Sequence, residues 1–292
     1  MSAPANPDPA RIALLTDFGN GEYAGIMRGV LAGLAPSTMV IDLSHQVAPQ
    51  AVLSAAYVLF SAWDYFPRGT VFCAVVDPGV GSGRELLFAE SGGRSLVAPD
   101  NGIVSLLARF KADLRCSRLR PPPGPAAPSG PSATFHGRDI FAPAAALAAR
   151  GESNRLRGEA IQPILDAQAL PEASTSSGRK TGRILHIDRF GNCVSALHRL
   201  DIEEYGDPER LSVSAGLFRT AGLKSHYAQV ESGQTLAYLG SAGFLEIAVR
   251  EGHAARLLKL GLGDKVVVAA AGSEKEPENR NPAQLNRSPR EK

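Results

Sequence analysis

The stretch VVDPGVGSGR, residues 75–84, carries side chains that can do chemistry. A predicted strand ends there on an acid, Asp77, and Arg84 follows after a run rich in glycine. An acid and a permanently charged cation can bind a polar ligand, and glycines let the backbone approach that ligand closely. An aspartate in this position is also a common turn former or helix cap. Alone, the stretch predicts a turn as readily as a site.

Acidic or polar groups follow two other predicted strands. In open α/β sheets, ligands bind outside the carboxyl ends of the strands, and neighbouring strands bring these groups to one rim. Asp42 and His45 are interpreted as capping and loop-bracing residues, and the alternative is a metal-dependent phosphoesterase that uses the whole set. The groups expected on this rim are Asp17, Asp42, His45 and Asp77.

Three further segments combine polar side chains with glycine. His136 lies in TFHGRDIF, residues 134–141, where it is either functional or an exposed, inert loop histidine. The segment IDRFGN, residues 187–192, is either a plain β-turn or an aromatic stacker flanked by an acid and an amide. The segment 241–243 is a tight turn between two predicted strands.

The first half of the chain alternates apolar runs with helical patterns. Predicted strands cover 11–16, 39–44 and 71–76, and predicted helices cover 22–34 and 50–62. The β-branched run 71–76 is typical of a strand covered on both faces, and 91–93 predicts a hairpin turn. We therefore expect an α/β N-terminal domain with a mostly parallel sheet flanked by helices.

In the second half, short apolar runs typical of strands alternate with turn residues. This pattern predicts an all-β, barrel-like C-terminal domain. Residues 120–133 are rich in proline, and we interpret this segment as an exposed loop within the first domain. The predicted organisation is an α/β domain at 1–172, a linker at 173–182, a β-barrel domain at 183–270 and a disordered tail at 271–292.

Several classes of protein are disfavoured. The glycine-rich loops match neither GxGxxG nor a phosphate-binding P-loop, so a dinucleotide or nucleoside-triphosphate enzyme is not expected. A net charge of +2 without a basic block gives no reason to expect nucleic-acid binding. No apolar run is long enough to span a membrane, and the cysteines show no CxxC spacing. We expect a cytoplasmic protein without a bound metal or cofactor.

Taken together, the motifs resemble the S-adenosylmethionine hydroxide adenosyltransferase family, whose members hydrolyse S-adenosylmethionine to adenosine and methionine. The resemblance covers roughly residues 11–270 and implies an α/β N-terminal domain, a C-terminal β-barrel and a homotrimer. It also implies active sites between the N-terminal domain of one subunit and the C-terminal domain of the next. The motifs are TDFG (16–19), IDLSH (41–45), FPRGTVFCAVVDPGVGSGR (66–84), APDNG (98–102), FHGRDIFAP (135–143), IDRFGN (187–192) and GSAGFLEIA (240–248).

The resemblance implies a role for each matching residue. The catalytic set that forms hydroxide corresponds to Asp77, Arg84 and His136, with the proton acceptor being either Asp77 or His136. Asp17 matches the acid that holds the ribose hydroxyls, and Asp188 matches the acid that meets the methionine ammonium. The residues that match the adenine contacts and the methionine end are Phe190, Asn192 and Ser241.

The chain departs from the family pattern in two places. The segment NGEYAG after TDFG is one residue shorter than usual, and the loop before His136 is unusually rich in proline. The related halogenating enzymes lack an acid at the position of Asp77, and the fluorinating ones carry an insertion where this chain has only 91–93. Hydrolysis is therefore favoured over halogenation. The alternative is a non-catalytic adenosine- or S-adenosylmethionine-binding protein on the same fold.

Overall fold

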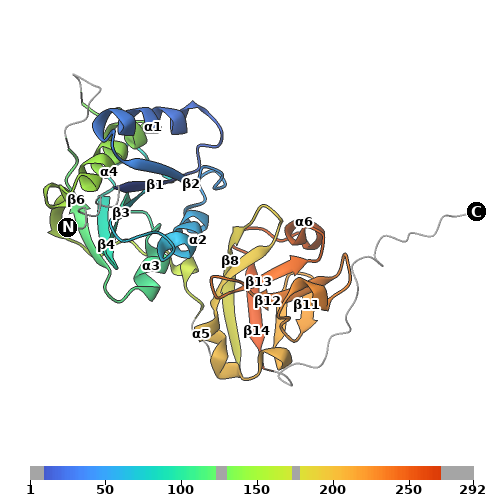
Figure 1. Cartoon of the computed structure of the whole chain (residues 1–292). Helices are drawn as coiled ribbons and strands as arrows, with labels where there is room; N and C mark the ends of the chain where they lie inside the picture. Colours follow the sequence, from blue (N-terminus) through green and yellow to red (C-terminus); the bar gives the residue numbers. More distant parts are fainter. Residues whose placement is uncertain (1–9, 123–129, 173–177, 271–292) are drawn as a thin grey trace, which may run out of the picture. The chain divides into compact units, whose positions relative to one another are not determined.

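The computed structural model describes residues 10–122, 130–172 and 178–270. The chain divides after Asp166 into two compact units (Figure 1). Part of the predicted proline-rich loop (123–129), part of the predicted linker (173–177) and the predicted tail (271–292) lie outside the described residues. Within the described part, no helix is both long and apolar enough to cross a membrane.

The first unit alternates strands and helices along much of its length. Its strands are β1 (Arg11–Thr16), β2 (Met39–Ser44), β3 (Thr70–Val75), β4 (Leu86–Ser91), β5 (Arg94–Pro99), β6 (Arg115–Leu119) and β7 (Arg157–Ala160). Its helices are α1 (Glu22–Leu34), α2 (Val52–Trp63), α3 (Ser105–Phe110) and α4 (Ala142–Ala149), with a π-helical turn at Gly137–Phe141 and short 3₁₀ turns at Ser153–Arg155 and, in the second unit, Ala167–Ala169.

The strands of the first unit form one sheet in the order β2-β1-β3-β5-β4-β6-β7. The pairings of β1 with β2, β1 with β3 and β3 with β5 are parallel. Those of β4 with β5, β4 with β6 and β6 with β7 are antiparallel. The predicted mostly parallel sheet is therefore correct for only half of the sheet. The hairpin at Gly92 and Gly93, which was predicted, makes β5 run against β4. After α3, β6 pairs with the other side of β4 and is antiparallel to it.

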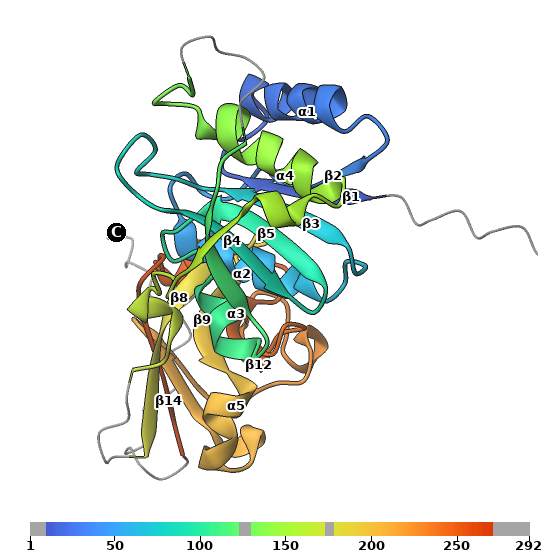
Figure 2. The same ribbon diagram turned by 90° about the vertical axis from the view of Figure 1, so that its left-hand side faces the viewer.

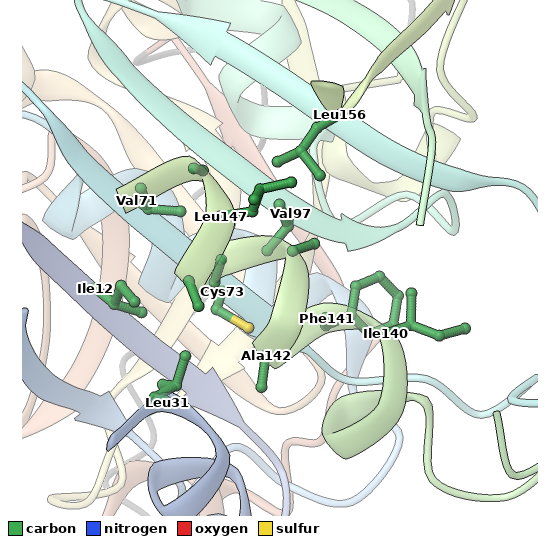
Figure 3. Packing of buried hydrophobic residues seen from close by; sticks show 14 of the residues in the cluster. Ile12, Leu31, Val71, Cys73, Val97, Ile140, Phe141, Ala142, Leu147 and Leu156 are labelled. Carbon is green, nitrogen blue, oxygen red and sulfur yellow. The ribbon is translucent and has the colours of Figure 1, made fainter. Parts of the chain in front are cut away.

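Alternation along β1 builds a core on each face of the sheet. Ile12 and Leu14 face α1 and α4, whereas Ala13 and Leu15 face α2 and α3. Figure 2 shows the two pairs of helices on opposite sides of the sheet, and Figure 3 shows the core beneath α4. All six residues of β3 are buried, as expected for a strand covered on both faces.

Local sequence explains where α1 begins and ends. Gly21 precedes it without a side-chain cap, and Glu22 places a negative charge in the first turn, where the helix dipole favours it. Ala24, Met27 and Leu31 are buried at helical spacing. The helix ends at Leu34 because Pro36 disfavours helical backbone in the residue before it.

The second unit is an antiparallel, nearly closed barrel-like sheet in the order β11-β10-β14-β8-β9-β13-β12. A bridge between Lys224 and Tyr238 links the chain after β11 to β12, at the other edge of the sheet. Its strands are β8 (Arg179–Ile187), β9 (Cys193–His198), β10 (Ser212–Ala215), β11 (Phe218–Ala221), β12 (Thr235–Leu239), β13 (Phe244–Val249) and β14 (Lys265–Ala269). Its helices are α5 (Arg199–Ile202) and α6 (Ala254–Leu258), with 3₁₀ turns at Glu203–Tyr205, Pro208–Arg210 and Tyr227–Gln229.

Candidate active site

Asp77 and Arg84 form an ion pair just beyond the carboxyl end of β3. Asp77 Oδ1 accepts hydrogen bonds from Arg84 Nη1 and from the Gly79 amide at 3.1 Å. The side chains are 7% and 22% exposed, so solvent screens the pair only weakly. A Cβ at Gly79 would collide with the Arg84 guanidinium, which explains a glycine here. Asp77 Oδ2 accepts no hydrogen bond from the described residues and is available to a ligand or water.

The loop of Arg84 packs against the segment that leads to His136. Gly81 has φ +79° and lies so close to the Ala133 carbonyl that any Cβ would collide with it. His136 is the residue before the π-helical turn and already has helical backbone angles. It is half-buried. Its ring makes no hydrogen bond with the residues that the structure describes. The backbones of two loops that are some fifty residues apart in the sequence thus lie in close contact.

An ion pair between the buried Asp139 and the partly exposed Arg138 fixes the chain on both sides of His136. Asp139 accepts two hydrogen bonds from Arg138, at 2.6 and 2.8 Å, and one from the Ser132 amide at 2.8 Å. The hydrogen bond from Arg138 is the main cause that lowers the pKa of Asp139, and the charge of His136 acts in the same direction. The Arg138 guanidinium also covers the ring of Phe135. This set holds the backbone of His136 but leaves its ring free.

Asp17 follows β1 on the same rim of the sheet. Its Oδ2 accepts a hydrogen bond from the Gln50 amide at 2.8 Å. The next residue, Phe18, belongs to an aromatic cluster with Tyr23 and Phe135, whose ring centroids lie 5.1–5.9 Å apart. Since Phe135 precedes His136, the cluster joins the loop of Asp17 to the loop of His136.

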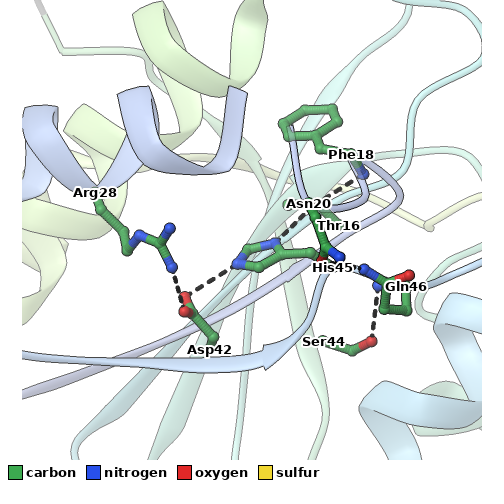
Figure 4. Close-up of polar contacts among 8 residues, drawn as sticks. All are labelled: Thr16, Phe18, Asn20, Arg28, Asp42, Ser44, His45 and Gln46. Carbon is green, nitrogen blue, oxygen red and sulfur yellow. Dashed lines mark hydrogen bonds and ion pairs between the residues drawn. The ribbon is translucent and has the colours of Figure 1, made fainter. Parts of the chain in front are cut away.

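A network of polar contacts supports the loop of Asp17, and Figure 4 shows its side chains. Thr16 Oγ1 lies 2.8 Å from His45 Nδ1, His45 Nε2 lies 3.0 Å from Asp42 Oδ1, and Asp42 pairs with Arg28. The Gly19 amide donates to the His45 carbonyl at 2.7 Å. Asp42 lies inside β2, not after it. These contacts agree with the interpretation of Asp42 and His45 as bracing residues.

The metal-dependent alternative gains no support from this arrangement. It requires Asp17, Asp42, His45 and Asp77 to share an ion, yet Asp42 and Asp77 each pair with an arginine. Across residues 10–122, 130–172 and 178–270, no group of three or more His, Cys, Asp and Glu side chains is placed to hold a metal.

Asp100 and Asn101 were not singled out by the sequence reasoning, although their motif APDNG was noted. Asn101 Nδ2 donates to the Val76 carbonyl at 2.8 Å and so fixes the chain immediately before Asp77. Asp100 is buried and accepts from the Ile164 amide at 2.8 Å. Burial raises the pKa of Asp100, and the positive charge of Arg84 partly opposes this effect. A polar pair directly after the apolar run of β5 was the available signal.

In the second unit, Asp188, Phe190 and Asn192 share the turn between β8 and β9. Asp188 Oδ1 accepts from the amides of Phe190 and Asn192 at 2.9 and 2.8 Å, and Asp188 Oδ2 accepts from Asn192 Nδ2 at 2.8 Å. This is a β-turn closed by its own acid, yet Phe190 is 75% exposed and its ring is free to stack. Gly191, at φ +87°, makes room for the ring of His253.

Ser241 lies elsewhere in the second unit. It is exposed in the turn between β12 and β13. The pairing of Phe244 with His198 and of Ile247 with Cys193 places this turn at the other end of β9 from Asn192. A strand of this length spans about 20 Å, so one chain does not bring Ser241 and Asn192 together. In Figure 1, α5 and α6 mark these two ends of the unit.

Comparisons with known proteins account for both units. Residues 12–157 match the model of the SAM hydroxide adenosyltransferase N-terminal domain, and residues 182–267 match that of the C-terminal domain. The chain belongs to the SAM hydroxide adenosyltransferase family. The residues that the resemblance singled out in the first unit all fall within the N-terminal match, and Asp188, Phe190, Asn192 and Ser241 fall within the C-terminal match.

Relatives in this adenosyltransferase family cover nearly the whole chain. A protein of Thermus thermophilus named (R)-S-adenosyl-L-methionine hydrolase is 39% identical over 86% of this chain and 96% of its own length. A protein of Methanocaldococcus jannaschii with the same name is 30% identical, over 88% and 95%. A fluorinase of Actinoplanes is 26% identical, over 92% and 100%. The crystal structure of an uncharacterized Thermotoga maritima protein matches with a TM-score of 0.78 and 31% identity, over 88% and 99%.

Proposed function

We propose that this protein hydrolyses S-adenosyl-L-methionine to adenosine and L-methionine by attack of water-derived hydroxide on ribose C5′. The observation that carries the proposal is the Asp77–Arg84 ion pair at the end of β3, with the loop of His136 packed against it. Membership of the adenosyltransferase family and the hydrolase names of the relatives support the same reaction.

The chemistry requires a nucleophile more than an acid. The leaving group is a sulfonium that departs as a neutral thioether, so no proton has to be supplied to it. Water has to lose a proton, and the charge of Arg84 favours the resulting hydroxide. His136, whose ring has no partner within the described residues, can accept that proton, as can the free Oδ2 of Asp77. A general base contributes about 10²–10⁴-fold to such a step.

The remaining residues have positioning roles in this proposal. Asp17 holds the ribose hydroxyls, so that C5′ stays in line with the nucleophile. Asp188 meets the methionine ammonium with the remaining lone pair of its Oδ2, and Phe190 and Asn192 contact adenine. Ser241, which matched the methionine end, lies at the other end of β9 and is not part of this proposed site. Charges cancel as the bond forms, so a pocket that excludes water favours the reaction.

The proposal includes an assembly and a location. We propose a homotrimer with each active site between the first unit of one subunit and the second unit of the next, because the functional residues fall into two sets on separate units. Light scattering coupled to size exclusion tests the trimer. The reaction uses no metal or cofactor and takes place in the cytoplasm, which fractionation of the native cells tests.

The reaction is tested with purified full-length protein, S-adenosylmethionine and a chelator in water enriched in ¹⁸O. Adenosine and methionine are expected, with the label in the 5′-hydroxyl of adenosine. The Asp77→Asn variant serves as the control for background breakdown. Unlabelled adenosine contradicts the attack on C5′, and activity lost on chelation contradicts the metal-independent route. Saturable binding without product identifies the non-catalytic alternative, and a 5′-halonucleoside in added halide salt identifies halogenation.

A further inference from the structure

A chain of hydrogen bonds crosses the second unit from Asn192 to Glu246. Asn192 Nδ2 lies 3.1 Å from Tyr227 Oη, and Tyr227 Oη lies 2.6 Å from Tyr238 Oη. Tyr238 Oη in turn donates to Glu246 Oε2. The residues come from the β8–β9 turn, the 3₁₀ turn Tyr227–Gln229, β12 and β13. We call this chain the Asn192–Glu246 relay.

The far end of the relay is held in place by packing. Tyr238 and Glu246 are 9% and 7% exposed, and they pair directly across β12 and β13. A Cβ at Gly240 would collide with Glu246 Oε1, so the carboxyl group fills space that only glycine leaves open. Burial raises the pKa of Glu246, and the hydrogen bond from Tyr238 opposes that effect.

The carboxylate gives the relay a direction. An ionised carboxylate only accepts hydrogen bonds, so the Tyr238 hydroxyl has to donate its hydrogen bond to Glu246. The Tyr238 oxygen is then left to accept from the Tyr227 hydroxyl. The Tyr227 oxygen in turn accepts from Asn192 Nδ2. Each hydroxyl thus points away from Asn192, toward Glu246.

This direction fixes which end of the Asn192 amide is free. Its two N–H groups meet Asp188 Oδ2 and Tyr227 Oη. A flipped amide would place Oδ1 against the Asp188 carboxylate, where two acceptors repel each other. Asn192 Oδ1 accepts no hydrogen bond within the described part of the chain, so the amide offers a ligand an acceptor.

We infer that the Asn192–Glu246 relay makes the site select a purine with an exocyclic amino group over a 6-oxo purine. The inference rests on the proposed function, which places adenine at Asn192. An amino group donates to Oδ1, whereas a 6-oxo group faces it as a second acceptor. Tyr227, Tyr238 and Glu246 are thus positioning residues that act through Asn192.

The test measures binding of adenosine and of inosine, its 6-oxo analogue, to the full-length protein by calorimetry. The titrations are run at mildly alkaline pH because burial raises the pKa of Glu246, and a higher pH favours its ionised form. The wild type is expected to bind adenosine at least about tenfold more tightly, since one hydrogen bond is gained and a repulsion avoided. Glu246→Gln keeps the shape but adds a donor that permits the reverse direction, and Tyr238→Phe cuts the relay. Both are expected to reduce the ratio to about threefold or less.

Tyr205→Phe is the matched control, because it also removes a half-buried tyrosine hydroxyl from this unit, one that donates to the Arg179 carbonyl. It is expected to keep the wild-type ratio. A wild-type ratio near one overturns the inference, as do relay variants that weaken both nucleosides equally. The test is independent of turnover. If the relay variants lose the preference for adenosine over inosine but the wild type does not hydrolyse S-adenosylmethionine, the relay is upheld and the proposed function is refuted. If the wild type hydrolyses S-adenosylmethionine but the relay variants keep the preference, the function is upheld and the relay is refuted.

Discussion

The acids described above are held in different ways in the two units. In the first unit, Asp42, Asp77 and Asp139 each pair with an arginine, whereas Asp17 and Asp100 accept hydrogen bonds from backbone amides. In the second unit, Asp188 and Glu246 are held by neutral amide and hydroxyl donors. Arginine pairs carry fixed charge to a rim, whereas neutral donors set the orientation of an acceptor.

This difference assigns different work to the two units. The first unit presents charges at the ends of parallel strands, where they act on a developing nucleophile. The second unit presents turns whose polar groups are already hydrogen-bonded, which suits recognition of an uncharged base. Changes in the first unit are therefore expected to alter kcat, and changes in the second are expected to alter KM.

The largest effect is expected from the Asp77–Arg84 pair. Arg84→Lys keeps a charge but loses the guanidinium fork, and Asp77→Asn removes the partner charge. Each is expected to lower kcat by about 10²–10³-fold with KM within about threefold, because the lost stabilisation acts in the transition state. Initial rates of adenosine release measure both constants. A rise in KM at unchanged kcat would remove the distinction between the units.

Gly79→Ala sharpens the comparison without removing any charge. The added methyl group collides with the Arg84 guanidinium and displaces it, so kcat is expected to fall by about 10–10²-fold. Gly83→Ala is the matched control, because a Cβ there has no heavy atom within 4 Å. Equal loss of activity in both variants, measured in the same assay, would show that the loop and not the position of Arg84 is responsible.

A smaller effect, and on the other constant, is expected from Asp188→Asn in the second unit. The new amide can still accept from the backbone of its own turn through Oδ1, but it no longer offers a charge to the methionine ammonium. KM is expected to rise about tenfold and kcat to change by less than about threefold. A drop in kcat as large as that of Asp77→Asn contradicts the division between the units.

The smallest effect on activity, but a clear one on stability, is expected from Asp139→Asn. Arg138, whose side chain is 33% exposed, loses its partner, so the free energy of unfolding is expected to fall at neutral pH. The pKa of Asp139 lies below its ordinary 3.8 in the folded state, so its contribution is present above that value and is lost as the pH falls through the lowered pKa. Urea unfolding at a series of pH values should show the stabilities of wild type and variant converging in acid. A constant difference refutes the ion pair as the cause.

The local patterns of the sequence were sufficient for much of the first unit. The continuous apolar run of β3, the helical spacing in α1 and the glycine hairpin at Gly92 are short-range signals, and the structure confirms all three. The Asp77–Arg84 pair was also within reach, because both residues lie on one short loop.

The parts that were missed depend on contacts between distant segments. The hairpin at 91–93 indicated only the antiparallel pairing of β4 with β5. β6 and the edge strand β7 are short, partly exposed and without clear alternation, so nothing local indicated that they extend the antiparallel half of the sheet. Tyr227, Tyr238 and Glu246 meet only when the barrel forms. A single acid inside the apolar run of β13 was the one local hint of Glu246, and it does not reveal its tyrosine partner.

The full burial of β3 has a consequence for how the protein opens. Amide hydrogens in a strand paired on both sides and covered on both faces exchange with solvent through global unfolding, whereas those of edge strands exchange through local fraying. Asp77 lies two residues after the end of β3, so we expect its backbone to be attached to one of the slowest-exchanging segments of the first unit. Deuterium uptake should therefore appear in β7 and β6 long before it appears in β3, the strand that precedes Asp77.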